Sequence, residues 1–426
     1  MVELRPFKAT ILNPRMENVS ELMCPVYDTI DASQYEHYSG RENNVIHVTT
    51  RKEGVAENEF VAHAKRALNR FFRNRILIEC KRPAFYVYGL RYRLSEEIKA
   101  QIPAKEQRES YFAFGLVALV KVEELNEDSI VGHEKTFEAS TRERYRLMKE
   151  CGMNFSPITA EYTMPDHAIN RIFEDYLRFI RPELKIVDDR KPVVDVELNG
   201  ARHLLWEVSD EELVGKIQAL MRDKTILILD GHHRYTASYL LSREREAEYT
   251  LMMLLEGGDR ALLLLPWHRC VKTCHMEALW TRIEEHFSIE RHGRGAIYST
   301  LNEADAVSVG MYDGKQFYLL HADEQKIKEL AAERCERVGL DILCLHEWLI
   351  EPAVRGKPED ISFTASPRDA VEKVDRGDYR VAFFLKPLRI ADVEYKARVE
   401  QKAFPQKSTL FLPKVAEGVV MRRFRS

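Results

Sequence analysis

The stretch LILDGHHRYTAS, residues 227–238, places an acid, a glycine, two histidines and an arginine directly after an apolar run. Backbone N–H groups at the start of a helix attract anions, phosphate above all, and a glycine lets the backbone approach a ligand closely. The side-chain types in this stretch suit phosphate binding and proton transfer. The candidate residues are Asp230, Gly231, His232, His233 and Arg234.

Each polar residue of this DGHHR turn (residues 230–234) has an expected role. Asp230 can orient a histidine, act as a catalytic base or bind Mg²⁺. His232 and His233 can exchange protons near neutral pH, and Arg234 can hold phosphate oxygens in a bidentate fork. The bland alternative is a capping aspartate, one buried histidine and a surface arginine. Five adjacent residues of these types favour the functional interpretation.

A second polar cluster is the HEKT segment, residues 133–136. We expect Glu134 to be a catalytic group, and His133, Lys135 and Thr136 to bind phosphate. A solvated loop capped by its threonine is an equally good interpretation of the same residues.

A third cluster is the QKST segment, residues 406–409, with a lysine shortly after it. It puts cations beside hydroxyls, a combination suited to phosphate, but it lacks the glycine spacing of a P-loop. The candidate phosphate-binding residues are Lys407, Ser408, Thr409 and Lys414. A fourth candidate is the proline-led turn that carries Tyr27 and Asp28, for which structural and functional interpretations are equally favoured.

The elements that must position these clusters alternate between strand and helix patterns. This order predicts an α/β (mixed α+β) fold, in three regions: 1–165 with the HEKT segment, 166–295 with the DGHHR turn and 296–426 with the QKST segment. Strands are expected at 84–92, 111–125, 191–198, 203–208, 225–229, 249–257, 261–269 and 380–388, and helices at 57–77, 141–153, 168–181, 210–222, 235–247 and 276–287.

Composition narrows the class of protein. The 426 residues carry a net charge of -4, which makes nucleic acid an improbable partner. No apolar run approaches the ~20 residues that span a membrane, and charges come too early for a secretory signal. The seven cysteines are scattered without a CxxC pair. We therefore expect a cytoplasmic protein without membrane partner, disulfides or structural zinc, and a solvated basic tail at 421–426.

Taken together and in order, these motifs resemble a broad prokaryotic family known as domain-of-unknown-function family 1015. The resemblance runs through nearly the whole chain, from LRPFKA and PVYDTI through HEKTF, GMNFSPI, DGHHRYTA and LPWHR to FPQKSTLFLPKVAEGVV. The chain departs from the family pattern where Val26 replaces a second proline and where Glu143 replaces an aspartate before Arg144. The family pattern makes Arg144 a further candidate for phosphate binding.

The DGHHR turn also has a more distant likeness, to the nucleotide-binding domains of ParB and sulfiredoxin. Some relatives in that superfamily phosphorylate free serine, and others hydrolyse CTP as switches. The likeness implies a central ParB/sulfiredoxin-like nucleotide-binding unit within a larger multi-lobed chain. It also implies that Asp230, His232, His233 and Arg234 lie at the phosphates.

These observations favour a small-molecule kinase that uses ATP or ADP with Mg²⁺, its acceptor a small hydroxy compound such as free serine. The alternatives are a nucleotide-binding switch with a protein or DNA partner, a metal-assisted hydrolase, and a purely structural protein. The acceptor, the nucleotide and the oligomeric state stay open. We expect the three segments to converge on one cleft. We also expect Arg234→Lys to weaken nucleotide binding with little change in stability, since Arg234 need not be buried.

Overall fold

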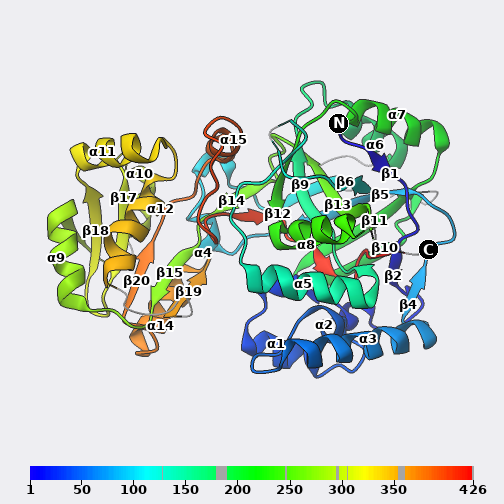
Figure 1. The fold of residues 1–426 in the computed structure, drawn as a ribbon, viewed down its shortest axis with the longest axis horizontal. Helices are drawn as coiled ribbons and strands as arrows, with labels where there is room; N and C mark the ends of the chain where they lie inside the picture. The colour runs from blue at the N-terminus through cyan, green and yellow to red at the C-terminus, as the bar shows by residue number, and fades with distance from the viewer. Residues whose placement is uncertain are drawn as a thin grey trace.

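The structure is a computed structural model, and it places the chain in two lobes. It describes residues 1–126, 128–178, 190–244, 247–293, 297–304, 306–353 and 360–424. In Figure 1 the large lobe lies on the right and the small lobe on the left. Helices α4 (Glu96–Lys99) and α15 (Ile390–Arg398) and strand β14 (Leu263–Leu265) lie between them. The expected mixed α/β class is confirmed.

A nine-stranded mixed sheet forms the centre of the large lobe, in the order β10-β11-β5-β6-β13-β9-β12-β7 with β1 beside β6. Its strands are rich in β-branched and aromatic residues, which pack well on a pleated surface. The strands are β1 (Leu4–Arg5), β5 (Phe85–Tyr92), β6 (Tyr111–Lys121), β7 (Ile130–Val131), β9 (Ile158–Tyr162), β10 (Val194–Leu198), β11 (Ala201–Val208), β12 (Ile226–Asp230) and β13 (Tyr249–Glu256).

Helices cover both faces of this sheet (Figure 1). On one face, Phe173 of α6 (Ala168–Leu177) and Ile217 of α7 (Glu211–Met221) belong to the same buried apolar cluster as Ile228 of β12. On the other side, α8 (His232–Arg243), α5 (Glu138–Cys151) and α3 (Glu57–Arg73) pack in successive layers. Short helices α1 (Ala32–Ser39) and α2 (Ile46–Thr49) complete this side.

The small lobe is a six-stranded sheet, β16-β18-β17-β20-β15-β19, with helices around it. Its strands are β15 (His268–Val271), β16 (Phe287–His292), β17 (Ser308–Tyr312), β18 (Phe317–Ala322), β19 (Ile361–Thr364) and β20 (Val381–Phe384). Its helices are α9 (Met276–His286), α10 (Ile297–Glu303), α11 (Glu324–Arg334), α12 (Leu340–Cys344), α13 (Glu351–Ala353) and α14 (Pro367–Asp375).

After the small lobe the chain returns to the large one through short strand pairs. These pairs are β21 (Leu410–Leu412) with β14, β22 (Ala416–Glu417) with β3 (Cys24–Pro25), β23 (Arg422–Arg423) with β8 (Met153–Asn154), and, near the start of the chain, β2 (Thr10–Leu12) with β4 (Leu77–Glu79). Residues 421–424 are thus anchored, which corrects this part of the expected solvated tail: Arg422 is buried and donates to the Tyr249 carbonyl. The last two residues of that expected tail lie outside the described residues.

The lobes divide the chain differently from the three expected regions. The expected boundary at residue 165 falls between β9 and β12, which pair in one sheet. The expected boundary at 295 falls between β16 and β17 of the small lobe. The expected strand at 261–269 is two strands, because β14 pairs with β21 between the lobes and β15 pairs with β20 in the small lobe.

Two general expectations can be compared with the described residues. Within them no helix has the length and apolar character needed to cross a membrane. All seven cysteines are described, and each is a free thiol.

Candidate functional site

Parallel strand pairing brings the HEKT segment beside the DGHHR turn. Strand β7 pairs parallel with β12, in the register Ile130 to Ile226 and Val131 to Leu227. Carboxyl ends of parallel strands lie at the same sheet edge, where ligands of α/β proteins commonly bind. The residues after β7 therefore emerge next to the residues after β12, although about a hundred residues separate them in sequence.

The QKST segment reaches the same place from the end of the chain. An isolated parallel bridge joins Glu134 to Phe404, and the Phe404 N–H donates to the His133 carbonyl at 2.8 Å. Glu134 Oε1 then accepts from the N–H groups of Ser408 at 3.2 Å and Thr409 at 3.0 Å. The expected meeting of the three segments is confirmed by these contacts.

Asp230, the last residue of β12, lies between two cations at the centre of the cluster. Arg234 Nη2 donates to Asp230 Oδ2 at 2.5 Å, and Lys414 Nζ pairs with Oδ1. Burial acts to raise the pKa of this carboxyl, but the ammonium of Lys414 and the guanidinium of Arg234 outweigh burial and hold the pKa below its usual range. Asp230 is therefore an anion whose two oxygens are both committed to cations.

Arg234 is buried, although the sequence led us to expect that an arginine at the mouth of the turn need not be. Its exposed fraction is 6%, because helix α8 begins at His232 rather than near residue 235. Besides Asp230, its Nη1 donates to Ser156 Oγ at 2.9 Å and to the Pro157 carbonyl at 2.7 Å. The guanidinium is thus held by protein groups and ties β12 to the segment before β9.

Gly231 makes this arrangement possible. Its φ of +97° lies in the left-handed region that favours glycine. A Cβ atom at this position would lie 2.9 Å from Nε and Nη2 of Arg234. Glycine is therefore needed here for two reasons: the turn requires a positive φ, and the Arg234 side chain packs where a Cβ atom would be.

Two of the three histidines of the cluster are inside the protein. The His133 ring Nδ1 lies 2.7 Å from the Ile228 carbonyl, and its Nε2 lies 2.8 Å from Thr409 Oγ1. His232 Nε2 accepts from the His133 backbone N–H at 3.2 Å. Burial lowers the pKa of both imidazoles, so both rings are neutral and serve to hold the segments together. We had expected His133 to bind phosphate and His232 to be catalytic, but in the structure both rings contact protein groups.

Because the buried His232 ring is neutral, the free energy of unfolding should depend on pH. An unfolded histidine titrates near pH 6.5, whereas burial lowers the folded pKa of His232 well below that value. Below about pH 6.5 the unfolded chain binds more protons, so the stability is complete above this pH and is lost as the pH falls, by up to ~1.4 kcal/mol per pH unit.

His232→Gln keeps an acceptor for the His133 N–H but removes the titration. Between about pH 7 and about pH 5 we expect its free energy of unfolding to fall about 2 kcal/mol less than that of the wild type. Urea unfolding at both pH values measures this difference. The exposed His37→Gln is the control and should follow the wild type. Equal pH slopes for His232→Gln and the wild type would show that the ring is already protonated or accessible.

The remaining residues of the HEKT and QKST segments form a clamp with an exposed rim. Thr409 Oγ1 lies 2.7 Å from Glu134 Oε1, so its hydroxyl sits between that carboxylate and the His133 ring. Ser408 Oγ donates to the Pro405 carbonyl at 2.6 Å. Lys135 is exposed and Thr136 half-buried on the outer side. The Glu134 carboxylate thus binds the QKST loop. It was expected to be a catalytic group, but its Oε1 oxygen is occupied by protein donors.

Arg144 supports the turn that carries Tyr27. Its guanidinium lies 4.2 Å from the centre of the Tyr27 ring, and its Nη1 donates to the Thr49 carbonyl at 2.7 Å. Glu143, the residue that departs from the family pattern, accepts from Arg144 and from Arg51, each at 2.5 Å. The longer acid therefore still holds the arginine. Arg144 is buried and committed to protein groups, so it does not reach out toward a ligand.

The accessible side of the site carries three polar groups from three segments. Lys407 Nζ lies 4.0 Å from Asp28 Oδ2, and the two side chains are about one third exposed, at 32% and 31%. His233 is half-buried, and its Nε2 accepts from the Phe137 N–H at 3.0 Å. Burial lowers the pKa of His233, so this ring also is neutral at pH 7.

Two residues of the LPWHR motif support this rim, and no role was expected for them. Lys407 Nζ lies 4.8 Å from the centre of a Trp267 ring. Arg269 is fully buried and donates to the backbone carbonyls of Lys407, at 3.2 Å, and of Trp267. Burial lowers the pKa of Arg269 to about 10. The sequence offered one indication, the adjacent tryptophan, histidine and arginine of the LPWHR motif. Which groups these side chains contact could be determined only from the fold.

The residues at Asp230 do not fit the expected Mg²⁺ site. A Mg²⁺ ligand needs carboxylate oxygens that are free to face the ion, and both oxygens of Asp230 face cations. Among the described residues there is also no group of three or more histidine, cysteine, aspartate or glutamate side chains that could hold a metal ion. The space inside the cluster is small, since a cavity of about 20 Å³ beside Arg234 and Glu417 suffices for one water molecule.

A comparison with family models identifies the family. The model described as "Protein of unknown function (DUF1015)" matches residues 4–342. The chain belongs to this family. Its description states no activity, and no curated protein matches the chain.

Solved structures match this DUF1015 protein at low identity. They include free serine kinase in complex with AMP (12% identity, TM-score 0.36, 70% of this chain and 94% of that one) and a conserved hypothetical protein from Pyrococcus furiosus (12%, 0.36, 70% and 97%). SbnI with a C-terminal truncation, from Staphylococcus aureus, matches with 12% identity and a TM-score of 0.37, over 71% of this chain and 86% of that one. TM-scores this low transfer no function.

Proposed function

We propose that this DUF1015 protein catalyses nucleotide-dependent phosphoryl transfer to a small hydroxy compound, at the accessible side of the Asp230 cluster. The observation that carries the proposal is the start of helix α8. Its first residue follows Gly231, and no side chain caps the helix there. The first N–H groups of a helix have no partner within it, so this end attracts a phosphate.

In this proposal, two lysine side chains from the C-terminal segment provide positive charge near the start of helix α8. Lys407 supplies positive charge on the side that Asp28 and His233 share, and Lys414 supplies it from within, where it pairs with Asp230. Phosphoryl transfer depends mainly on positioning and on neutralising phosphate charge, which N–H groups and ammonium groups provide. Asp230 and Arg234 act from within, because they hold Lys414 and the turn in place.

We assign the catalytic base to Asp28 within this proposal. The carboxylates of Asp230 and Glu134 are engaged by protein donors, whereas Asp28 is partly exposed beside Lys407. The acceptor oxygen attacks the terminal phosphorus of the nucleotide, and its proton passes to the Asp28 carboxylate. The bond from that phosphorus to the bridging oxygen breaks, and the nucleotide leaves with one phosphate fewer.

The nucleotide and the acceptor are to be identified by screening. ATP, ADP, GTP and CTP are compared by thermal shift, with ATP or ADP the expected ligand. Turnover is then followed by phosphorus NMR against hydroxy compounds that include free serine. Nucleotide binding without acceptor-dependent turnover would favour a nucleotide-binding switch instead. Turnover that needs water and a divalent metal alone would favour a metal-assisted hydrolase.

Lys407→Met should weaken nucleotide binding roughly tenfold to a hundredfold. Losing one charge-assisted contact costs about 1.5–3 kcal/mol, which corresponds to that range. Calorimetric titration of the variant with the nucleotide found in the screen gives the measurement. The control is Lys402→Met, an exposed lysine five positions earlier, which should bind like the wild type. Unchanged affinity in Lys407→Met would remove the QKST segment from the phosphate site.

A further inference from the structure

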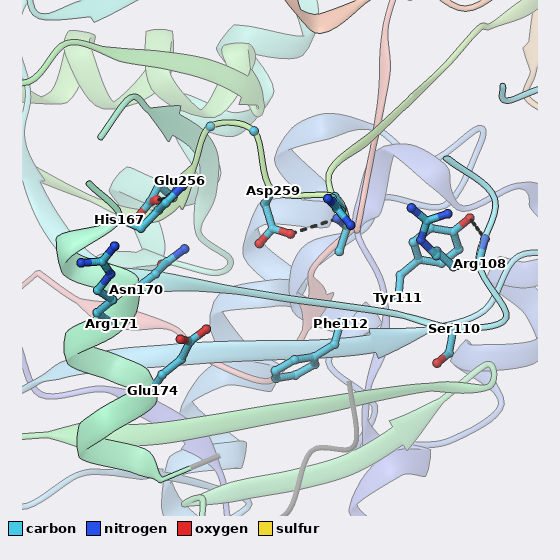
Figure 2. A pocket seen from close by; sticks show the side chains of 14 residues that line it. Arg108, Ser110, Tyr111, Phe112, His167, Asn170, Arg171, Glu174, Glu256 and Asp259 are labelled. Atoms are coloured by element: carbon cyan, nitrogen blue, oxygen red, sulfur yellow. Dashed lines mark hydrogen bonds and ion pairs between the residues drawn. The ribbon is translucent and has the colours of Figure 1, made fainter. Parts of the chain in front are cut away.

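A second cavity lies at the opposite edge of the large sheet, away from Asp230. Strands β9 and β13 are parallel neighbours, and they end here at Tyr162 and Glu256. Asp230 is paired with Thr159, near the start of β9, so it belongs to the other edge. The cavity has a volume of about 560 Å³, within the range of small-molecule sites. Figure 2 shows it between α6 and the turn that follows β13.

The place of this cavity is one where α/β folds bind ligands. Ligands lie outside the carboxyl ends of parallel strands, where the following helix begins. Helix α6 begins at Ala168, shortly after β9 ends, and no side chain of the preceding His167 caps it. His167, Arg171 and Glu174 recur along α6 at a spacing of three to four residues, so one side of the helix forms a wall of the cavity (Figure 2).

Three arginines from three separate segments line the cavity. Arg108 precedes β6, Arg171 lies on α6, and Arg260 lies in the turn after β13. Within the part of the chain that the structure describes, none of the three forms an ion pair with a carboxylate, and the Arg108 guanidinium donates only to the carbonyls of Lys105 and Gln107. A guanidinium offers a planar pair of donors that matches phosphate and carboxylate oxygens.

Each acidic side chain of the wall has a partner in the local structure, although the second oxygen of Glu256, Oε2, is buried without one. The Glu256 carboxylate pairs with His167 Nδ1, and its side chain is buried. Asp259 Oδ1 accepts from the Ala261 N–H at 2.9 Å and so closes its own turn. Glu174 also has a partner. The charged donors that are left for a ligand are therefore the three arginines, beside the neutral side chains of Ser110 and Asn170.

We propose that this cavity binds a small organic anion through phosphate or carboxylate oxygens, held by Arg171 and Arg260 with Arg108 at the rim. A neighbouring cavity of about 500 Å³ shares Arg108 and Arg260 and continues toward the small lobe. It gives room for the rest of a larger ligand. The site is independent of the proposed phosphoryl transfer, because it lies at the other edge of the sheet.

Protection of the arginines from phenylglyoxal tests the site directly. The wild-type protein is treated with phenylglyoxal alone, with sodium pyrophosphate and with citrate, and each arginine is followed by peptide mass spectrometry. We expect pyrophosphate or citrate to slow modification of Arg171 and Arg260 at least fivefold. Arg66, an exposed arginine on α3, should react equally fast in all three samples.

The two anions distinguish the two ligand types. Protection by pyrophosphate alone assigns a phosphate ligand, and protection by citrate alone a carboxylate ligand. Arg171→Gln combined with Arg260→Gln should bind the protecting anion at least tenfold more weakly in calorimetry, whereas Arg66→Gln should not differ from the wild type. Protection should persist in Lys407→Met, which separates this site from the Asp230 cluster. Equal modification rates with and without both anions would overturn the proposal.

Discussion

Replacing Arg234 by methionine should lower the free energy of unfolding by about 3–5 kcal/mol, the range for removing one partner of a buried ion pair. Arg234 is 6% exposed, and its guanidinium donates to Asp230, Ser156 and the Pro157 carbonyl. Methionine fills much of the volume but leaves these acceptors without their donor. Glu417, a second buried carboxyl, also loses a cation that acts to lower its pKa against the effect of burial.

Arg234→Lys should fall between the wild type and Arg234→Met. A lysine keeps the charge near Asp230, but one ammonium cannot reproduce the guanidinium geometry that reaches both the Ser156 hydroxyl and the Pro157 carbonyl. Urea unfolding with matched slopes gives the three values. The control is Arg146→Met on α5, where the pair with Glu57 is at the surface and the change should stay within about 0.5 kcal/mol.

This experiment also decides between two roles of Arg234. If Arg234→Lys unfolds at the same urea concentration as the wild type but loses nucleotide affinity, the arginine binds phosphate directly, as the sequence alone led us to expect. A loss of stability with nearly unchanged affinity in the folded fraction identifies a residue that holds the turn from within.

Asp28→Asn should lower the turnover number of the proposed phosphoryl transfer by a factor of ~10²–10⁴, the usual contribution of a general base. Asparagine has nearly the same shape and keeps an acceptor oxygen, but it cannot take up the proton of the acceptor hydroxyl. The contact of Asp28 with Lys407 is long, at 4.0 Å, and both side chains are partly exposed, so the fold should tolerate the change. Nucleotide affinity should therefore change little.

Steady-state kinetics with the acceptor found by screening, together with calorimetric nucleotide binding, separates these two effects. The control is Glu36→Gln, an exposed carboxylate of the same N-terminal region that pairs with Lys52. It should keep wild-type turnover. A turnover number within threefold of the wild type in Asp28→Asn would remove Asp28 as the base. Absence of any acceptor-dependent turnover in the wild type would instead defeat the proposed function as a whole.

Local patterns determined most elements of the large lobe. The expected helix at 57–77 is α3, and the expected strands at 84–92 and 111–125 are β5 and β6. Apolar periodicity is sufficient for such elements, because each one buries a face that its own sequence defines. The same reasoning could not place the boundaries between lobes. The chain leaves the large sheet after β13, and β14 then pairs with β21 across the whole small lobe in sequence. Such long-range strand pairing leaves no local pattern.

The residue types of the site could also be predicted from the sequence. We expected the HEKT, DGHHR and QKST segments to lie together because none of them alone has all the groups that a phosphate site needs. What each side chain faces was decided only by the tertiary structure. Helix α8 begins at His232, three residues earlier than expected, and this turns Arg234 inward onto Asp230. The parallel register of β7 with β12 buries His133, while Asp28 is left beside Lys407 at the surface. Which polar groups are accessible to a ligand depends on helix phase and strand register, because a shift of one residue turns each side chain toward a different neighbour.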